Sequence, residues 1–200
     1  MPLIRLTATT LLCLVTLAAT AADSSHSHDH GSAYAGQEQR RIKSLSPDDL
    51  AELKRGGGWG LAKAAELNGV PGPAHLLEMK DAIHLSPDQI KAIEAVFESM
   101  RVAAVAEGKT LIALETRLED AFRDRSIDDA SLQAMLRDIA DSRMRLRHIH
   151  LSAHLKTPAL LREQQIAHYN ALRGYGNNDP CLSVPEGHNA EMWRKHNGCD

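Results

Sequence analysis

Aromatic residues are scarce in this chain of 200 residues: tryptophan, tyrosine and phenylalanine make up 4% of the sequence, whereas charged residues make up 24%. Strands favour aromatic and β-branched residues, while long surface helices tolerate a charged, aromatic-poor composition. The apolar positions also recur at helical spacing. We therefore expect an all-α fold rather than a sandwich or a barrel.

An excess of charge of one sign is also missing, because 23 Lys and Arg residues nearly balance 26 Asp and Glu residues and leave a formal net charge of -3. Nucleic-acid-binding domains usually carry a basic excess, so we expect no nucleic acid as a partner. Catalytic motifs are missing too: there is no nucleophile elbow, phosphate loop or His-Glu-x-x-His helix. We expect that the protein is not an enzyme and requires no cofactor.

The long apolar run is confined to the N-terminus and is short. Arg5 precedes an uncharged stretch at 6–20, and small residues occupy 18–22. This pattern is typical of a secretory signal peptide, since a membrane-spanning helix needs about 20 apolar residues. We expect cleavage near Ala22, which removes residues 1–22 and leaves a periplasmic protein without a membrane span.

Cysteine is rare, and only Cys181 and Cys199 remain once the signal peptide is removed. In an oxidising compartment we expect them to form a disulfide that closes a C-terminal loop at 176–200. His188 and His196 lie between them, so a metal site is the alternative, although the spacings do not match the usual zinc-finger patterns. An intermolecular disulfide is a third possibility.

The mature chain divides into three parts. The polar stretch at 23–44 carries His26, His28 and His30 and is expected to be a flexible arm that scavenges metal loosely. Residues 45–175 are long enough for one helical domain with a modest core. The C-terminal loop completes the chain.

Helix-start signals divide the domain into segments. A Ser-Pro-Asp-Asp sequence opens a short helix at Ser46 that should end at Gly56, and a related sequence opens the longest helix at Ser86. This long helix should end at 123–126, where we expect Ser126 to cap the next helix.

Apolar residues in the two long segments recur in alternating steps of three and four, which is typical of a coiled-coil-like seam. The seam of the first is Ile90, Ile93, Phe97, Met100, Ala104, Leu111, Leu114 and Leu118, and that of the second is Leu132, Met135, Ile139, Ser142, Leu146, Ile149 and Ala153. We expect a long antiparallel hairpin with short flanking helices. The last of these helices should follow the break at Thr157 and Pro158, and its inner side should carry Leu161, Gln165, Ile166, Tyr169 and Leu172. Glu107 interrupts the first seam, and we expect it to pair with Arg143; a metal-binding or switch role is the alternative.

Two pairs of metal-ligating residues stand at helical spacing. His150 and His154 are four residues apart, and His75 and Glu78 are three apart. These steps put both donors of a pair on one helix face, within reach of a divalent ion such as zinc. If the segment before Pro87 folds against the end of the second long helix, the pairs combine into one site. Packed or solvated side chains are the alternative.

The sequence Leu85-Ser-Pro-Asp-Gln89 returns in altered form as Leu161-Arg-Glu-Gln-Gln165. Together with a signal peptide and a helical hairpin, this pair resembles the Spy/CpxP family of periplasmic proteins, whose signature is a Leu-Thr-x-x-Gln motif. Ser86 replaces the threonine conservatively, and Arg162 replaces it outright. The resemblance covers residues 75–175.

The resemblance implies an all-α hairpin that forms a cradle-like dimer and works without a nucleotide. It implies an ATP-independent holding chaperone or stress-response modulator of the cell envelope, whose partners are unfolded envelope proteins or a membrane sensor protein. The alternative is a periplasmic sensor or buffer of zinc, copper, nickel or cobalt, as in the zinc-resistance-associated and CnrX-like branches. Residues of the hairpin that suit a client-binding surface are Met100, Met135, Met144, Arg101, Arg143, Arg145 and Arg147. The alternative is that they are ordinary core residues or residues of a solvated helix face.

Overall fold

The computed structural model describes residues 32, 34–175, 181, 184 and 188–199. Its contacts divide the chain into residues 1–35 and residues 36–200, and each is described by itself. The first contributes a local turn, in which the backbone N–H of Ala35 donates to the carbonyl oxygen of Ser32 at 2.9 Å. The expected signal peptide and the histidines of the expected arm lie outside the described residues.

The described part of residues 36–200 is all-helical and contains no strand. Its helices are α1 (Pro47–Arg55), α2 (Lys63–Glu66), α3 (Pro73–Glu78), α4 (Pro87–Arg123), α5 (Asp129–Lys156), the 3-10 helix η1 (Pro158–Leu160), α6 (Glu163–Leu172) and α7 (Ala190–Asn197). The all-α prediction is confirmed. No helix in this part of the chain has the length and apolarity needed to cross a membrane.

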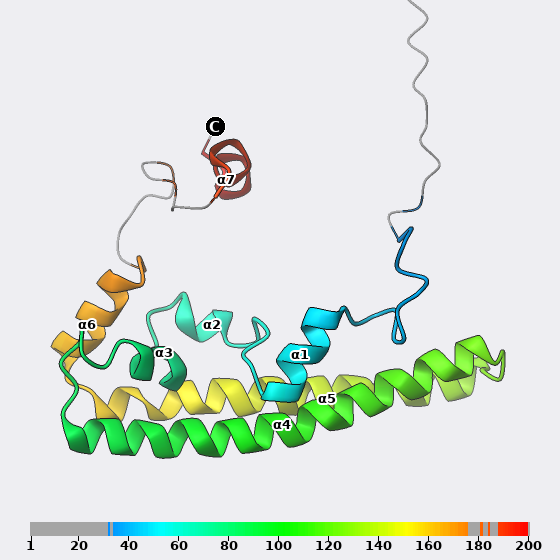
Figure 1. Ribbon diagram of the computed structural model, residues 1–200, viewed down its shortest axis with the longest axis horizontal. Coiled ribbons are helices and arrows are strands. Elements are labelled where there is room, and N and C mark those ends of the chain that lie inside the picture. The colour runs from blue at the N-terminus through cyan, green and yellow to red at the C-terminus, as the bar shows by residue number, and fades with distance from the viewer. Residues whose placement is uncertain (1–31, 33, 176–180, 182–183, 185–187, 200) are drawn as a thin grey trace, which may run out of the picture. The chain divides into compact units, whose positions relative to one another are not determined.

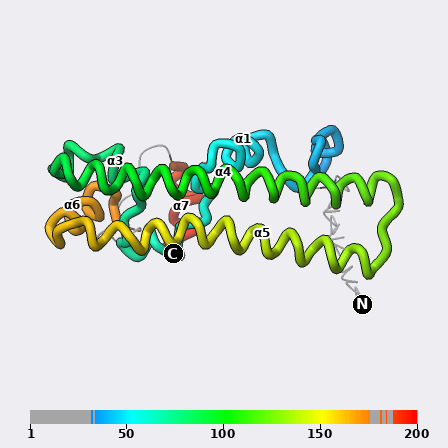
Figure 2. Tube along the Cα trace, turned by 90° about the horizontal axis from the view of Figure 1, so that it is seen from below, coloured from blue at the N-terminus to red at the C-terminus, as the bar shows by residue number. Residues whose placement is uncertain are grey.

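The longest helix, α4, packs against α5, and α1, α2 and α3 lie along one side of this pair (Figure 1). Figure 2 shows α4 and α5 side by side, with α5 running back from the turn that joins them. The helix α6 lies near the start of α4 and the end of α5 (Figure 1). Segments far apart in the sequence, α3 and α6, therefore meet at one end of the α4/α5 pair.

Capping boxes begin the helices α1, α4 and α5, with Ser46, Ser86 and Asp128 as the N-cap residues. In each box the N-cap side chain accepts the backbone N–H three residues later, and the side chain at that position accepts the N-cap N–H. The prediction that Ser126 caps α5 is wrong. Ser126 closes the end of α4 instead, because its backbone N–H donates to the carbonyl oxygen of Ala121 at 3.0 Å.

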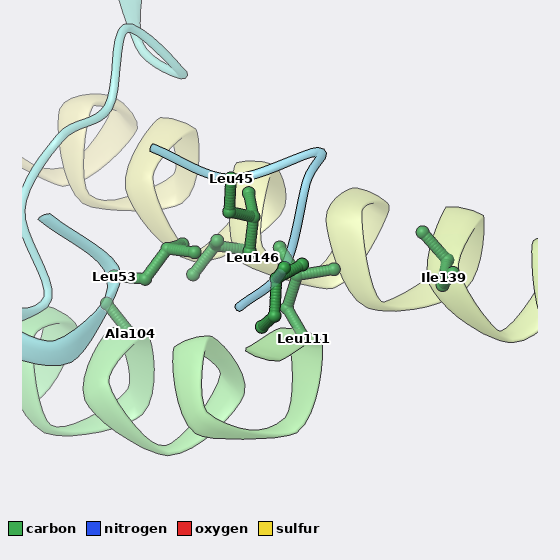
Figure 3. Close-up of a cluster of buried hydrophobic side chains, with 7 residues drawn as sticks. Leu45, Leu53, Ala104, Leu111, Ile139 and Leu146 are labelled. Carbon is green, nitrogen blue, oxygen red and sulfur yellow. The ribbon is translucent and has the colours of Figure 1, made fainter. Parts of the chain in front are cut away.

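The larger hydrophobic core lies where α1 and the segment before it cover the α4/α5 pair (Figure 3). Its buried members are Ile42, Leu45, Leu53, Ala104, Leu111, Ile139 and Leu146. The last four were predicted from the seam. Ile42 and Leu45 are 2% and 1% exposed, so the packed part of the chain begins within the stretch expected to be an arm.

Helix α1 approaches α4 closely at two glycines. Gly56 ends α1 as predicted, with a left-handed φ of 71°, and a Cβ added there would lie 2.9 Å from the carbonyl oxygen of Arg101. Gly108, on α4, lies under the backbone of Leu53. Side chains larger than hydrogen at these positions would hold the two helices apart.

A second core lies at the other end of the pair and consists of Leu76, Ile83, Ile93 and Tyr169. These residues come from α3, from α4, from α6 and from the segment between α3 and α4. Leu172 was predicted to face inward as well, but it is 50% exposed. The reason is that α6 contacts its neighbours mainly through its first two turns, where Gln165 and Tyr169 are buried.

Polar side chains cross the α4/α5 contact in two places. Glu107 accepts a hydrogen bond from Ser142 at 2.5 Å and pairs with Arg145 at 3.2 Å, whereas Arg143 donates to Glu115 at 2.8 Å. The predicted pair of Glu107 with Arg143 is therefore wrong. Consecutive helical residues point about 100° apart, so with Ser142 in the seam Arg143 and Arg145 reach opposite sides of α5.

Candidate functional site

The two copies of the motif meet. Ser86 and Gln89 form the capping box of α4, while at α6 only the glutamine half is formed: the Oε1 atom of Gln165 accepts the N–H of Arg162 at 3.0 Å. The amides of Gln89 and Gln165 also pair with each other, at N–O distances of 2.9 and 3.1 Å. Further bonds run from Gln89 to the carbonyl oxygen of Leu160 and from Gln165 to that of His84. Leu85 and Leu161 pack against the second core.

This glutamine pair holds α6 so that Tyr169 reaches α2. The Tyr169 side chain is fully buried, and its hydroxyl donates to the Oε2 atom of Glu66 at 2.9 Å. The other carboxylate oxygen, Oε1, accepts from the Nδ1 atom of His75 at 2.9 Å. Burial raises the pKa of Glu66, but the hydrogen bonds from His75 and Tyr169 outweigh this effect and lower the pKa overall. Glu66 is therefore held as a carboxylate.

The ring of His154 is oriented by a backbone carbonyl group. Its Nδ1 atom lies 2.9 Å from the carbonyl oxygen of Val70, and its Nε2 atom lies 3.9 Å from Oε1 of Glu66. A carbonyl and a carboxylate only accept, so the bonded Nδ1 atoms of His154 and His75 carry the protons. When these rings are neutral, each Nε2 atom keeps its lone pair.

His150 lies one turn before His154 and is 3% exposed. Its Nε2 atom is buried and has no hydrogen-bond partner among the described residues. Burial lowers the pKa of His150, and the nearby His154 lowers it further, which favours the neutral ring. A buried polar atom without a partner costs about 1–3 kcal/mol, so this nitrogen is a natural contact for a ligand.

All four predicted metal ligands, His75, Glu78, His150 and His154, line one pocket, and Glu66 lines it as well. The pocket has a volume of about 680 Å³ and lies between the glycine-rich segment after α1, the helices α2 and α3, and the α4/α5 pair. The structure thus brings together the two pairs found in the sequence. Within the described ranges, however, no three His, Cys, Asp or Glu side chains are arranged to hold a metal ion.

Gly72 allows α3 to come this close to α5. A Cβ atom added to Gly72 would lie 2.7 Å from the Nε2 atom of His154 and 3.0 Å from Oε1 of Glu66. Both distances are too short for ordinary packing. Only glycine at this position leaves open the space beside the Nε2 atom of His154 and the Oε1 atom of Glu66.

Sequence reasoning missed Glu66, Tyr169 and Val70 as parts of this site. Glu66 stands in a short helix of only four residues, which has too few positions to reveal a buried face. The contact of Tyr169 with Glu66 spans 103 positions of the chain. The only signal was the place of Tyr169 on the predicted inner side of the last helix.

The C-terminal cysteines are bonded to each other, as predicted. Cys181 and Cys199 form a disulfide with a Cα–Cα distance of 5.2 Å. The alternative of a Cys and His metal site in this loop is therefore wrong, since neither thiolate is free to bind a metal. His188 instead packs edge-on against Trp193, with ring centroids 4.9 Å apart.

Comparisons of the chain with protein-family models, with curated proteins and with solved structures return no match. The resemblance to the Spy/CpxP family therefore stays a prediction that depends on the motif residues.

Proposed function

We propose that the protein is an exported envelope-stress protein of the Spy/CpxP type that binds a divalent transition-metal ion through His75, His150 and His154. The observation that supports this most is that the Nε2 atoms of the three imidazoles have no hydrogen-bond partner within the described part of the chain. All three rings line one pocket.

The hydrogen bonds around the imidazoles support metal binding, although the three rings must shift toward one another to share one ion. A histidine that binds a metal through one nitrogen usually donates its other N–H to a carboxylate or a backbone carbonyl, which fixes the ring and its tautomer. Glu66 plays this part for His75, and the carbonyl group of Val70 plays it for His154. The third nitrogen, on His150, gains a partner when the metal binds. Glu78 supplies a carboxylate at the same pocket.

A bound ion would link α3 to α5, because His75 comes from the first and His150 and His154 come from the second. Metal binding would then favour the docked position of α3. In this proposal the docked state is what a membrane sensor protein or another envelope partner recognises, and no catalytic step is involved.

The test is calorimetric titration of the mature protein with zinc, copper, nickel and cobalt. Replacing both His150 and His154 with Ala should weaken binding at least about tenfold, as losses around metal sites do. His148→Ala is the matched control, because His148 is exposed on the same helix and does not line the pocket. Equal affinities for the double variant and the control would contradict the proposal.

A holding chaperone is the second candidate, and exposed apolar side chains on α4 and α5 favour it. These are Val102, Phe122, Leu136, Met144 and Leu155, each at least 48% exposed. Of the three methionines expected on a client surface, only Met144 is so exposed, and Met100 is buried. In this reading a cradle-like dimer presents the apolar side chains to unfolded envelope proteins.

This candidate is tested by the aggregation of a denatured envelope protein without ATP. The wild-type protein should slow aggregation, and Met144→Lys together with Leu155→Lys should reduce the effect, because both changes remove apolar contact area. Lys156→Arg is the control at a charged position. No protection at several-fold molar excess counts against the chaperone, and sedimentation equilibrium tests the dimer.

A further inference from the structure

The pocket extends well beyond the histidines, and its other walls are apolar and aromatic. Trp59, Phe97, Met100 and Tyr175 line it, in addition to the groups already described. A volume of about 680 Å³ is far more than a metal ion needs and falls in the range of sites for small organic molecules. Such sites combine apolar walls with a few polar groups that fix the orientation of the ligand.

The charges on this part of the pocket are mainly positive. Arg55, Lys63, Arg101 and Arg173 line it, against the carboxylates Glu66 and Glu78. Two of the cations are already neutralised, since Arg55 pairs with Glu52 and Arg101 pairs with Glu98. The oxygens of Glu66 are occupied by His75 and Tyr169. Lys63 and Arg173 form no salt bridge with a carboxylate among the described residues, although the charge of Glu66 acts on Arg173 from further away and favours its charged form.

Arg173 is the more distinctive of the two cations. Its guanidinium lies over the ring of Tyr175, at 5.4 Å from the centroid, and one terminal nitrogen donates to the Tyr175 hydroxyl at 3.0 Å. Its Nε atom is buried and has no partner in the described part of the chain. A guanidinium held in place by an aromatic ring, with a free N–H, is suited to the planar fork of a carboxylate.

We propose that this pocket binds a small organic anion whose carboxylate contacts Arg173 and whose bulky apolar body lies against Trp59, Phe97 and Met100. The four residues that would contact the anion differ from the proposed metal ligands, although all of them line the same pocket. Its ligand is an amphipathic monocarboxylate rather than a metal ion or a polypeptide. The anion supplies the missing partner of the Arg173 Nε atom, and the apolar walls supply most of the buried area.

The experiment uses mature protein in which Trp193→Phe leaves Trp59 as the reporter of tryptophan fluorescence, with a chelator present throughout. The probe is adamantanecarboxylate, and the matched probes are adamantanemethanol and adamantylmethylamine, which share the apolar body but are neutral or cationic. We expect a saturable change in Trp59 emission with the carboxylate and binding at least about tenfold weaker with the other two, since a hydrogen bond between ionised groups is lost.

Two variants locate the site. Arg173→Gln should weaken binding of the carboxylate about tenfold or more while leaving the neutral alcohol unaffected. Arg147→Gln is the matched control, because Arg147 is exposed on α5 and does not line the pocket. Ala74→Phe, at the pocket wall, should exclude all three probes by filling space. Helix content by circular dichroism shows whether each variant is folded.

Equal affinity for the three probes would overturn the proposal, and so would binding that survives both Arg173→Gln and Ala74→Phe. The outcome for the proposed metal site is independent of this experiment, because these titrations contain a chelator and the metal titrations contain no organic anion. If Arg173→Gln does not fold, Ala74→Phe and the comparison of the three probes still decide the question.

Discussion

Replacing Gly108 with Ala sets helix propensity against packing, and the two effects have opposite signs. Gly108 lies in the interior of α4, where Ala is favoured over Gly by about 1 kcal/mol. On propensity alone, the substitution would stabilise the protein. The new methyl group, however, would lie 3.1 Å from the carbonyl carbon of Leu53 and closer still to its oxygen. These are backbone atoms of α1, which cannot rotate away as a side chain does.

The cost of this contact follows from what α1 must do to relieve it. If α1 stays in place, overpacking costs about 1–3 kcal/mol. If α1 moves off, the burial of Leu53, which is 2% exposed, is lost at a similar cost of about 1.5–3 kcal/mol. After the propensity gain is subtracted, we expect a net loss of about 1 kcal/mol in the free energy of unfolding. For a chain of this size, that lowers Tm by about 2–4 °C.

The assay is urea or thermal unfolding followed by circular dichroism. Ala106→Gly is the matched control, because Ala106 is exposed on the same helix and its replacement measures the propensity term alone, about 1 kcal/mol. If Gly108→Ala stabilises the protein by the amount that Ala106→Gly costs, α1 does not lie on α4 as described. A loss in both variants supports the packing.

Three further predictions concern buried polar groups. Gln165→Leu should lower the free energy of unfolding by about 2–3 kcal/mol, because the partners at Gln89 and the His84 carbonyl lose their bonds; Gln164→Leu, at an exposed position, should change it by less than about 0.5 kcal/mol in the same urea titration. Glu115→Gln should cost about 1–2 kcal/mol by weakening the bond from Arg143, and equal unfolding curves would refute this pairing. With a chelator present, the free energy of unfolding should fall as the pH drops below about 6.5, because burial lowers the pKa of His150 in the folded protein and the unfolded chain therefore takes up the proton first. His150→Gln should reduce this pH dependence, and unfolding midpoints measured across the pH range would show it.

The helix starts and the apolar seam were predictable because they depend on neighbours in the sequence. Ser86 can be recognised as an N-cap from the three residues that follow it, and Ile93 or Leu111 as core from the spacing of its apolar neighbours. The start of α5 was misplaced by two residues, because Ser126 and Asp128 have similar local preference for the N-cap. The position of the chain reversal decides between them, and that is set by the packing of the two long helices.

The partners of polar groups were not predictable in the same way. Glu107 meets α5 at Ser142, next to the predicted Arg143, but the arginine that pairs with it is Arg145, which lies two residues further along and on the other side of α5. Ile42 was missed because two isolated apolar residues in a polar stretch show no period. For the pocket, sequence spacing identified the histidine pair on α5 and its companion on α3, while Glu66 depends on contacts that no local pattern encodes.

The motif glutamines lie away from the pocket, yet the contacts connect them to it. The hydrogen bonds between Gln89 and Gln165 hold the start of α6 against the start of α4, and this fixes the position of α6, which carries Tyr169. Tyr169 in turn donates to Glu66, and Glu66 orients the ring of His75. Each of these contacts is a short, directed hydrogen bond between buried or half-buried groups, which permits little rotation. A helix-start motif without chemistry of its own thus sets the geometry of the residues proposed to bind a metal ion.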